Sequence, residues 1–359
     1  MKKNIFFIGL IILCSSCNKV IEPDAPEKIF EKYKSSVVLI ANYYYYEITV
    51  DNSIYYYSPS SEKKIYFTKE DVLKNLSFST GTGFIISESG EVITNNHVAN
   101  PKDENYKNEL FSLNESVKTD IIENIRRCND TIENIKTNYI QNSSNMDYDE
   151  KERYETAYDL MRNQKDNLVE KYKIFNNVNF NNSSSKLVIY KLGIAYNDTY
   201  VTEFDDMQEC IVVKLSDKEN VDLALIQTKN KTFNTKPKNI FNFKDNNPNV
   251  FENPEKTKER DIKKPVKINE DVFMIGFNRG FSLANTKQGI KSQFTSGKIS
   301  QENDGERILY TIPTLEGSSG SPVVDKWGNL IGVNFAKMTN SQNFSFAIPV
   351  YELKKFYEE

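Results

Sequence analysis

Residues 314–322 read Thr-Leu-Glu-Gly-Ser-Ser-Gly-Ser-Pro. Glycines at 317 and 320 flank Ser319 and predict a tight turn between two strands. Such a turn can direct several backbone N–H groups at one point. Hydrolysis by a serine needs this arrangement, because the hydroxyl attacks a carbonyl whose oxygen becomes an anion in the transition state. Ser319 is therefore the candidate nucleophile.

A serine hydroxyl is a weak nucleophile until a neighbouring base takes its proton, and the base is usually a histidine. The chain has one histidine, His97. An imidazole in turn needs a carboxylate that fixes its tautomer and stabilises its cation. Asp222 begins the apolar run Asp-Leu-Ala-Leu-Ile and is the candidate for that role. These three residues form the candidate catalytic set.

Short β-branched and aromatic runs bounded by glycine and asparagine predict a β protein, either a barrel or a sandwich. A short helix is expected near residues 27–34 and a closing helix at 351–359. The predicted strands cover residues 36–50, 81–87, 91–94, 186–190, 210–215, 222–227, 271–276, 293–300, 307–311, 321–324, 330–334 and 344–348.

The stretch from about 101 to 185 has a different pattern. Apolar residues recur at steps of three and four from Leu113 to Tyr139 and again from Tyr154 to Phe175, and a polar break separates the two runs. This periodicity predicts a helical hairpin inserted into the β protein. A lid or brace is favoured for it over a coiled-coil partner site.

Four segments in this order resemble the landmarks of trypsin-like serine peptidases, most closely the bacterial HtrA-type branch. They are Gly81-Thr-Gly-Phe-Ile-Ile86, Ile93-Thr-Asn-Asn-His-Val98, Asp222-Leu-Ala-Leu-Ile226 and Gly317-Ser-Ser-Gly-Ser-Pro322. The chain order His, Asp, Ser is that of the chymotrypsin clan. The resemblance covers residues 36–101 and 186–349 approximately.

This resemblance implies two six-stranded antiparallel β-barrels with the catalytic residues in the cleft between them. By the same resemblance, Ser319 is the nucleophile, His97 the general base and Asp222 its orienting group. The backbone N–H groups of Gly317 and Ser319 would form the oxyanion hole. Ser318 stands where trypsin has an aspartate that pairs with a freed N-terminus, so that zymogen switch is not expected. The PDZ domain common in HtrA proteins is expected to be absent.

The resemblance also implies a set of residues around the S1 pocket. Position 313, six residues before the nucleophile, carries proline rather than an acid, which argues against a preference for Lys or Arg. A pocket lined by these residues favours substrates with a small or medium apolar side chain at the cleavage site. The set consists of Pro313, Thr314, Leu315, Asn334, Phe335 and Ala336.

Residues 1–17 have the basic, apolar and small-residue order of a secretory signal. Small residues before Cys17 resemble the lipobox of bacterial lipoproteins, which implies lipidation of Cys17 and a cell-envelope location, facing the periplasm or the cell surface. A plain secretory signal is the alternative. Cys128 and Cys210 would remain as thiols, either joined in one disulfide or buried separately.

Composition limits the remaining function classes. Hydrophobic residues make up 38% of the chain and the formal net charge is −4. The apolar content supports a packed core, and the mildly acidic balance does not favour nucleic-acid binding. With one histidine and four cysteines a Cys/His zinc cluster is excluded. We expect no metal and no cofactor, a protein or peptide substrate, and membrane contact through the lipid only.

The sequence thus divides into a signal (1–17), a tether with a short helix (18–35), a first barrel (36–228) with its insertion (101–185), a connector (229–268), and a second barrel with a closing helix (269–359). Two functions are compatible with it. One is an endopeptidase that acts through an acyl-enzyme. The other is a catalytically silent scaffold that binds partners through the helical insertion.

Overall fold

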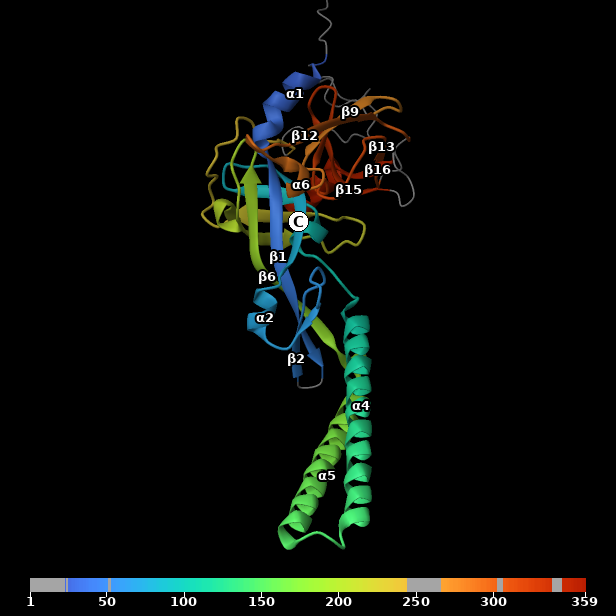
Figure 1. Ribbon diagram of the computed structural model, residues 1–359. Helices are drawn as coiled ribbons and strands as arrows, with labels where there is room; N and C mark the ends of the chain where they lie inside the picture. Colours follow the sequence, from blue (N-terminus) through green and yellow to red (C-terminus); the bar gives the residue numbers. More distant parts are fainter. Residues whose placement is uncertain (1–22, 24, 51–52, 244–265, 302–305, 338–343) are drawn as a thin grey trace, which may run out of the picture.

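The computed structural model describes residues 23, 25–50, 53–243, 266–301, 306–337 and 344–359 (Figure 1). The predicted signal and Cys17 lie outside these ranges, as does most of the predicted connector. Within them, no helix is both long enough and apolar enough to span a membrane. Cys128 and Cys210 are buried as free thiols, so of the two alternatives the structure has separate thiols.

Six strands form a closed antiparallel barrel in the first half of the fold. Their order is β1-β4-β5-β8-β7-β6, and pairing of β1 with β6 closes the ring. The strands are β1 (Val37–Val50), β4 (Ser77–Ile85), β5 (Glu91–Thr94), β6 (Ser184–Tyr196), β7 (Gln208–Leu215) and β8 (Ala224–Thr228).

Six further strands form a second sheet that curls into a half-barrel. Its order is β12-β9-β14-β15-β16-β13, and a bridge between Ile299 and Tyr310 brings the two edges together. Its strands are β9 (Asp271–Gly276), β12 (Gln293–Lys298), β13 (Ile308–Tyr310), β14 (Pro322–Asp325), β15 (Leu330–Lys337) and β16 (Ser345–Pro349). These two units and the helical hairpin confirm the predicted β-rich fold, with the second unit less closed than a full barrel.

The two β units share one hydrophobic core. Side chains alternate along a strand, and in β1 Leu39 belongs to a cluster that also holds Phe273 and Val324 of the half-barrel, whereas Val38 and Ile40 face a separate cluster. Helices α1 (Pro26–Tyr33) and α7 (Val350–Glu358) also pack on the shared core. This shared core fixes the position of one unit against the other.

Strands β1 and β6 continue beyond the barrel as a stalk, joined by β2 (Ser53–Tyr57), β3 (Ile65–Tyr66) and α2 (Lys69–Leu73) (Figure 1). The sequence did not predict β2 or β3. A stalk cluster of buried residues holds the base of the helical hairpin on this extension. It consists of Tyr44, Tyr46, Ile48, Val50, Tyr57, Ile65, Tyr106 and Leu110.

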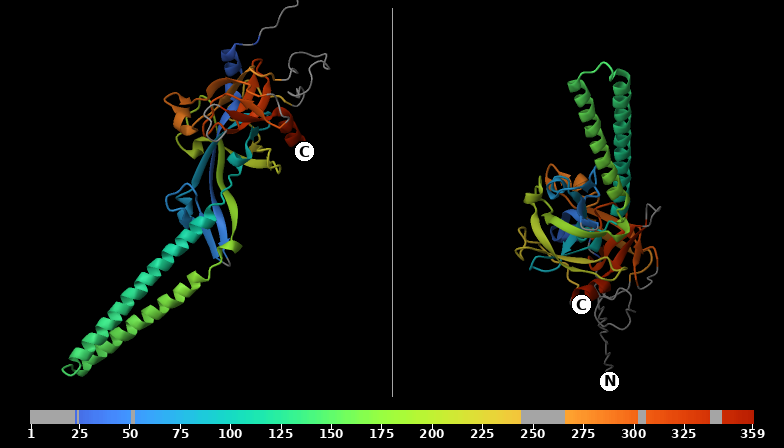
Figure 2. Two further views of the ribbon diagram at one scale, coloured as in Figure 1. Left: turned by 90° about the vertical axis from the view of Figure 1, so that its right-hand side faces the viewer. Right: turned by 90° about the horizontal axis from the view of Figure 1, so that it is seen from below.

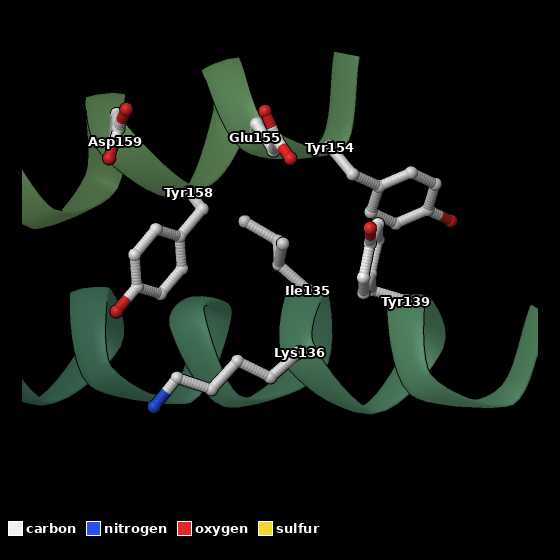
Figure 3. Close-up of a pocket in the computed structure, with 7 residues that line it drawn as sticks. All are labelled: Ile135, Lys136, Tyr139, Tyr154, Glu155, Tyr158 and Asp159. Carbon is white, nitrogen blue, oxygen red and sulfur yellow. The ribbon is translucent and has the colours of Figure 1, made fainter. Parts of the chain in front are cut away.

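The helical hairpin consists of α4 (Tyr106–Asn142) and α5 (Tyr148–Asn176) and projects from the stalk as a long arm (Figure 2). A capping box begins α5, because Asp147 accepts from the Glu150 N–H and Glu150 accepts from the Asp147 N–H. Between the helices lies a cavity of about 350 Å³ (Figure 3). It is lined by Ile135, Lys136, Tyr139, Tyr154, Glu155, Tyr158 and Asp159.

Short elements complete the described chain. One of them, α3, carries His97. The elements are α3 (Asn96–Ala99), α6 (Phe281–Ala284), β10 (Asn285–Thr286), β11 (Gly289–Ile290) and the 3₁₀ turns at Lys34–Ser36, Phe180–Asn182 and Phe204–Asp206.

Candidate active site

His97 lies on α3, the single helical turn that follows β5. Strand β1 holds this turn from behind, because the fully buried Asn42 donates its Nδ2 hydrogens to the carbonyl oxygens of Val98 and Ala99 at 3.0 and 3.3 Å. Those carbonyls end the helix and have no partner within it. A polar side chain from the barrel wall therefore sets the position of the His97 backbone.

Both carboxylate oxygens of Asp222 contact His97. Oδ2 lies 2.5 Å from the imidazole Nδ1, and Oδ1 accepts the backbone N–H of His97 at 3.0 Å. Because a carboxylate only accepts, Nδ1 is the ring nitrogen that donates, and in the neutral imidazole this leaves the lone pair on Nε2. Asn95 holds the Asp222 backbone in turn, since its Nδ2 donates to the Asp222 carbonyl at 2.7 Å. The structure thus brings the two predicted residues together in the geometry that a general base requires.

Ser319 stands on a turn that requires glycine on either side. Gly317 and Gly320 have φ of 92° and 86°, in the left-handed region that other residues seldom adopt. A Cβ at Gly317 would lie 2.5 Å from the carbonyl oxygen of Phe277, and one at Gly320 would lie 2.1 Å from that of Thr82. Both contacts are with backbone atoms, so neither position has room for a side chain.

Two peptide groups of this turn are oriented by bonds to their carbonyls. The Glu316 carbonyl accepts the N–H of Arg279 at 2.5 Å, and the Ser318 carbonyl accepts from Nδ2 of Asn334 at 2.9 Å. In a trans peptide the N–H points opposite to the C=O. The N–H groups of Gly317 and Ser319 are therefore turned away from these partners, and across the described ranges neither of them donates a hydrogen bond. They are the two groups that the resemblance assigns to the oxyanion hole.

Thr82 of β4 connects the turn around Ser319 to the segment that carries His97. Its backbone N–H donates to the Ser319 carbonyl at 2.8 Å, and its own carbonyl accepts from Oγ1 of Thr94 at 2.8 Å. Thr94 is three residues before His97. In the part of the chain that the structure describes, the Ser319 hydroxyl makes no hydrogen bond with the His97 imidazole. Such catalytic bonds often tighten only when substrate binds.

The six predicted S1 residues differ in exposure and in the groups that they contact. Pro313 and Leu315 are exposed and Phe335 is half-buried, while Oγ1 of Thr314 lies 2.8 Å from Oγ of the buried Ser345. The Asn334 side chain is buried and points at the turn around Ser319 instead, with Tyr310 donating to its Oδ1 at 2.6 Å. Ala336 lies on β15 opposite Phe346.

Sequence reasoning did not identify Asn42, Thr82, Tyr310 or Arg279 as site residues. The Gly-Thr-Gly triplet at 81–83 was the only available signal for Thr82, because the two partners of its hydroxyl are 195 and 235 residues away in the chain. Among the described residues, no group of three or more His, Cys, Asp and Glu side chains could hold a metal ion.

Comparison with known proteins gives one family match. Residues 180–333 match the model of the trypsin-like peptidase domain. This range contains Asp222 and Ser319, and His97 precedes it. No curated protein matches the chain. A similar solved structure is that of the serine endoprotease from Yersinia pestis, with a TM-score of 0.45 and 14% sequence identity, covering 94% of this chain and 67% of that one.

Proposed function

We propose that the protein is a serine endopeptidase of the HtrA-like branch, which hydrolyses peptide bonds of proteins or peptides through Ser319, His97 and Asp222. The observation that carries this proposal is the two-point contact of Asp222 with His97, at 2.5 Å to Nδ1 and 3.0 Å to the backbone N–H. This contact holds the His97 backbone and fixes the tautomer of its ring, as the carboxylate of a catalytic triad does. The trypsin-like peptidase match over residues 180–333 supports the same reaction class.

In the proposed mechanism, Oγ of Ser319 attacks the scissile carbonyl while Nε2 of His97 takes the hydroxyl proton. Asp222 stabilises the imidazolium that results, and the N–H groups of Gly317 and Ser319 bind the oxyanion. The imidazolium then gives its proton to the leaving amine, and the acyl-enzyme remains. Water attacks this ester with His97 again as base, which releases the acid and restores the serine.

The proposed S1 pocket would take a small or medium apolar side chain. Thr314, Leu315 and Phe335 supply neutral groups there, and position 313 offers no charge to pair with Lys or Arg. The basic, apolar and small-residue order of residues 1–17 supports a place of action outside the cytoplasm. We propose that Cys17 is lipidated and that the enzyme works in the cell envelope, on the periplasmic side or at the cell surface.

A fluorophosphonate probe tests the proposal, because it reacts with a serine that is activated by a base and an oxyanion hole. We expect the wild type to be labelled and Ser319→Ala not to be. Ser321→Ala is the matched control, since Ser321 is in the same turn and its buried Oγ has no partner among the described residues. Unlabelled wild-type protein that is shown to be folded would instead support the silent scaffold that binds through its hairpin.

A further inference from the structure

We infer that Thr82 is a positioning residue that sets the turn around Ser319 against the His97 segment; the inference rests on the proposed function. Thr82 is fully buried on β4 and uses every polar group that it has. Its N–H donates to the Ser319 carbonyl at 2.8 Å, and its carbonyl accepts from Thr94 at 2.8 Å. One residue of the barrel thus bonds to both halves of the site.

The hydroxyl of Thr82 makes the two remaining bonds, both across the boundary between the β units. Oγ1 donates to the Gly317 carbonyl at 2.8 Å and accepts the Phe277 N–H at 3.0 Å. A hydroxyl can do both at once because it is donor and acceptor. Gly317 and Phe277 belong to the two segments that meet behind the candidate oxyanion hole, where a Cβ on Gly317 would touch the Phe277 carbonyl.

The Thr82 hydroxyl bonds to the Gly317 carbonyl, and the peptide group of that carbonyl lies between the two peptide groups that carry the candidate oxyanion donors. The Thr82 hydroxyl fixes the peptide group after Gly317, while the bond from Arg279 to Glu316 fixes the one before it. Without the hydroxyl, the Gly317 carbonyl and the Phe277 N–H would lose a buried partner. The turn would then shift to find other partners, and the N–H groups of Gly317 and Ser319 would shift with it. Misplacement of such donors affects the transition state more than substrate binding.

The test compares Thr82→Val, which keeps the shape and removes the hydroxyl, with Thr82→Ser, which keeps the hydroxyl. Thr228→Val is the matched control, because Thr228 is also fully buried in the barrel and, among the described residues, its Oγ1 bonds only to the Thr232 carbonyl, at 2.9 Å. The measurements are kcat and KM on a cleaved peptide, the fluorophosphonate labelling rate, and hydrogen exchange of residues 315–321 by mass spectrometry.

We expect Thr82→Val to lower kcat and the labelling rate about 10²-fold with little change in KM, since a displacement of about 1 Å has an effect of that size. Thr82→Ser and Thr228→Val should stay near wild type in both. Folded Thr82→Val protein with wild-type kcat would overturn the inference. A Thr82→Ser variant as slow as Thr82→Val would do the same, because the hydroxyl would then not be the cause.

Hydrogen exchange separates this inference from the proposed function. If the wild type shows no turnover, faster exchange of residues 315–321 in Thr82→Val, and not in Thr228→Val, still supports the positioning role. Unchanged exchange there overturns it. Should Thr82→Val not fold, Thr82→Ala takes its place with kcat expressed per folded molecule, and a wild-type value then refutes the role.

Discussion

Asn334 uses both ends of its side chain to hold the turn that carries Ser319. Nδ2 donates to the Ser318 carbonyl at 2.9 Å and Oδ1 accepts the Tyr310 hydroxyl at 2.6 Å. Burial raises the pKa of Tyr310 well above its usual value, so the hydroxyl stays protonated and can donate. The orientation of the Ser319 N–H therefore depends on neutral groups. Trypsin, by contrast, has an aspartate paired with its freed N-terminus at the position that corresponds to Ser318.

Asn334→Asp replaces that amide donor by an acceptor of the same shape. Because two oxygens would then face each other, we expect kcat to fall about 10²-fold, comparable to the loss of one oxyanion donor. Tyr310→Phe should reduce kcat less, since the amide keeps its bond to Ser318. Steady-state kinetics measures both effects.

The control for Tyr310→Phe is Tyr196→Phe, because Tyr196 is another buried tyrosine whose hydroxyl bonds to an amide oxygen, that of Gln208 in the first barrel. It should leave kcat unchanged while it lowers stability to a similar extent. Equal losses of kcat in the two variants would mean that Tyr310 acts only through overall stability.

At the scale of elements, the strands were predictable where apolar alternation and turn residues agree, as in the hairpin of β4 and β5. The tyrosine run of β1 predicted a strand correctly. Its residue pattern does not change where β1 leaves the barrel and enters the stalk, so it gave no sign that the stalk holds two further strands, β2 and β3. His97, Asp222 and Ser319 could be proposed from local motifs. Thr82 and Tyr310 could not, because their roles come from partners distant in the chain.

The hairpin can be shortened if its outer part supports only itself. We expect replacement of residues 121–172 by a short Gly-Ser linker to preserve the unfolding midpoint and fluorophosphonate labelling, since α5 has no buried residue among those described. Urea unfolding followed by circular dichroism measures the midpoint.

A longer deletion, 106–176, is the comparison, because it also removes Tyr106 and Leu110, which are 6% and 2% exposed in the stalk cluster. Uncovering their tyrosine neighbours should lower the midpoint or the yield. An insoluble or unlabelled protein from the shorter deletion would show that the outer hairpin takes part in folding or in the site.

At the scale of the whole molecule, the shared core predicts that the barrel and the half-barrel unfold together. Leu39 is fully buried in the barrel and belongs to the same cluster as Val324 of the half-barrel. Leu39→Ala should cost about 2–5 kcal/mol of unfolding free energy. The sole tryptophan, Trp327, lies between β14 and β15 and reports on the half-barrel. We expect its fluorescence midpoint in urea to move with that of circular dichroism.

Leu160→Ala serves as the control, because Leu160 is 62% exposed on α5 and its truncation should move neither midpoint. If Leu39→Ala left the Trp327 fluorescence midpoint unchanged while it lowered the circular-dichroism midpoint, the barrel and the half-barrel would be two independently stable units.

The arm formed by α4 and α5 points away from the end of the molecule where α1 lies (Figure 1). With 37 residues in α4, it is about 55 Å long. An extended polypeptide covers at most about 3.4 Å per residue. A polypeptide bound at the tip of the arm would therefore need at least about 16 extended residues to span the arm alone. The proposed peptidase would leave a protein bound there uncut if its unstructured ends were shorter than that.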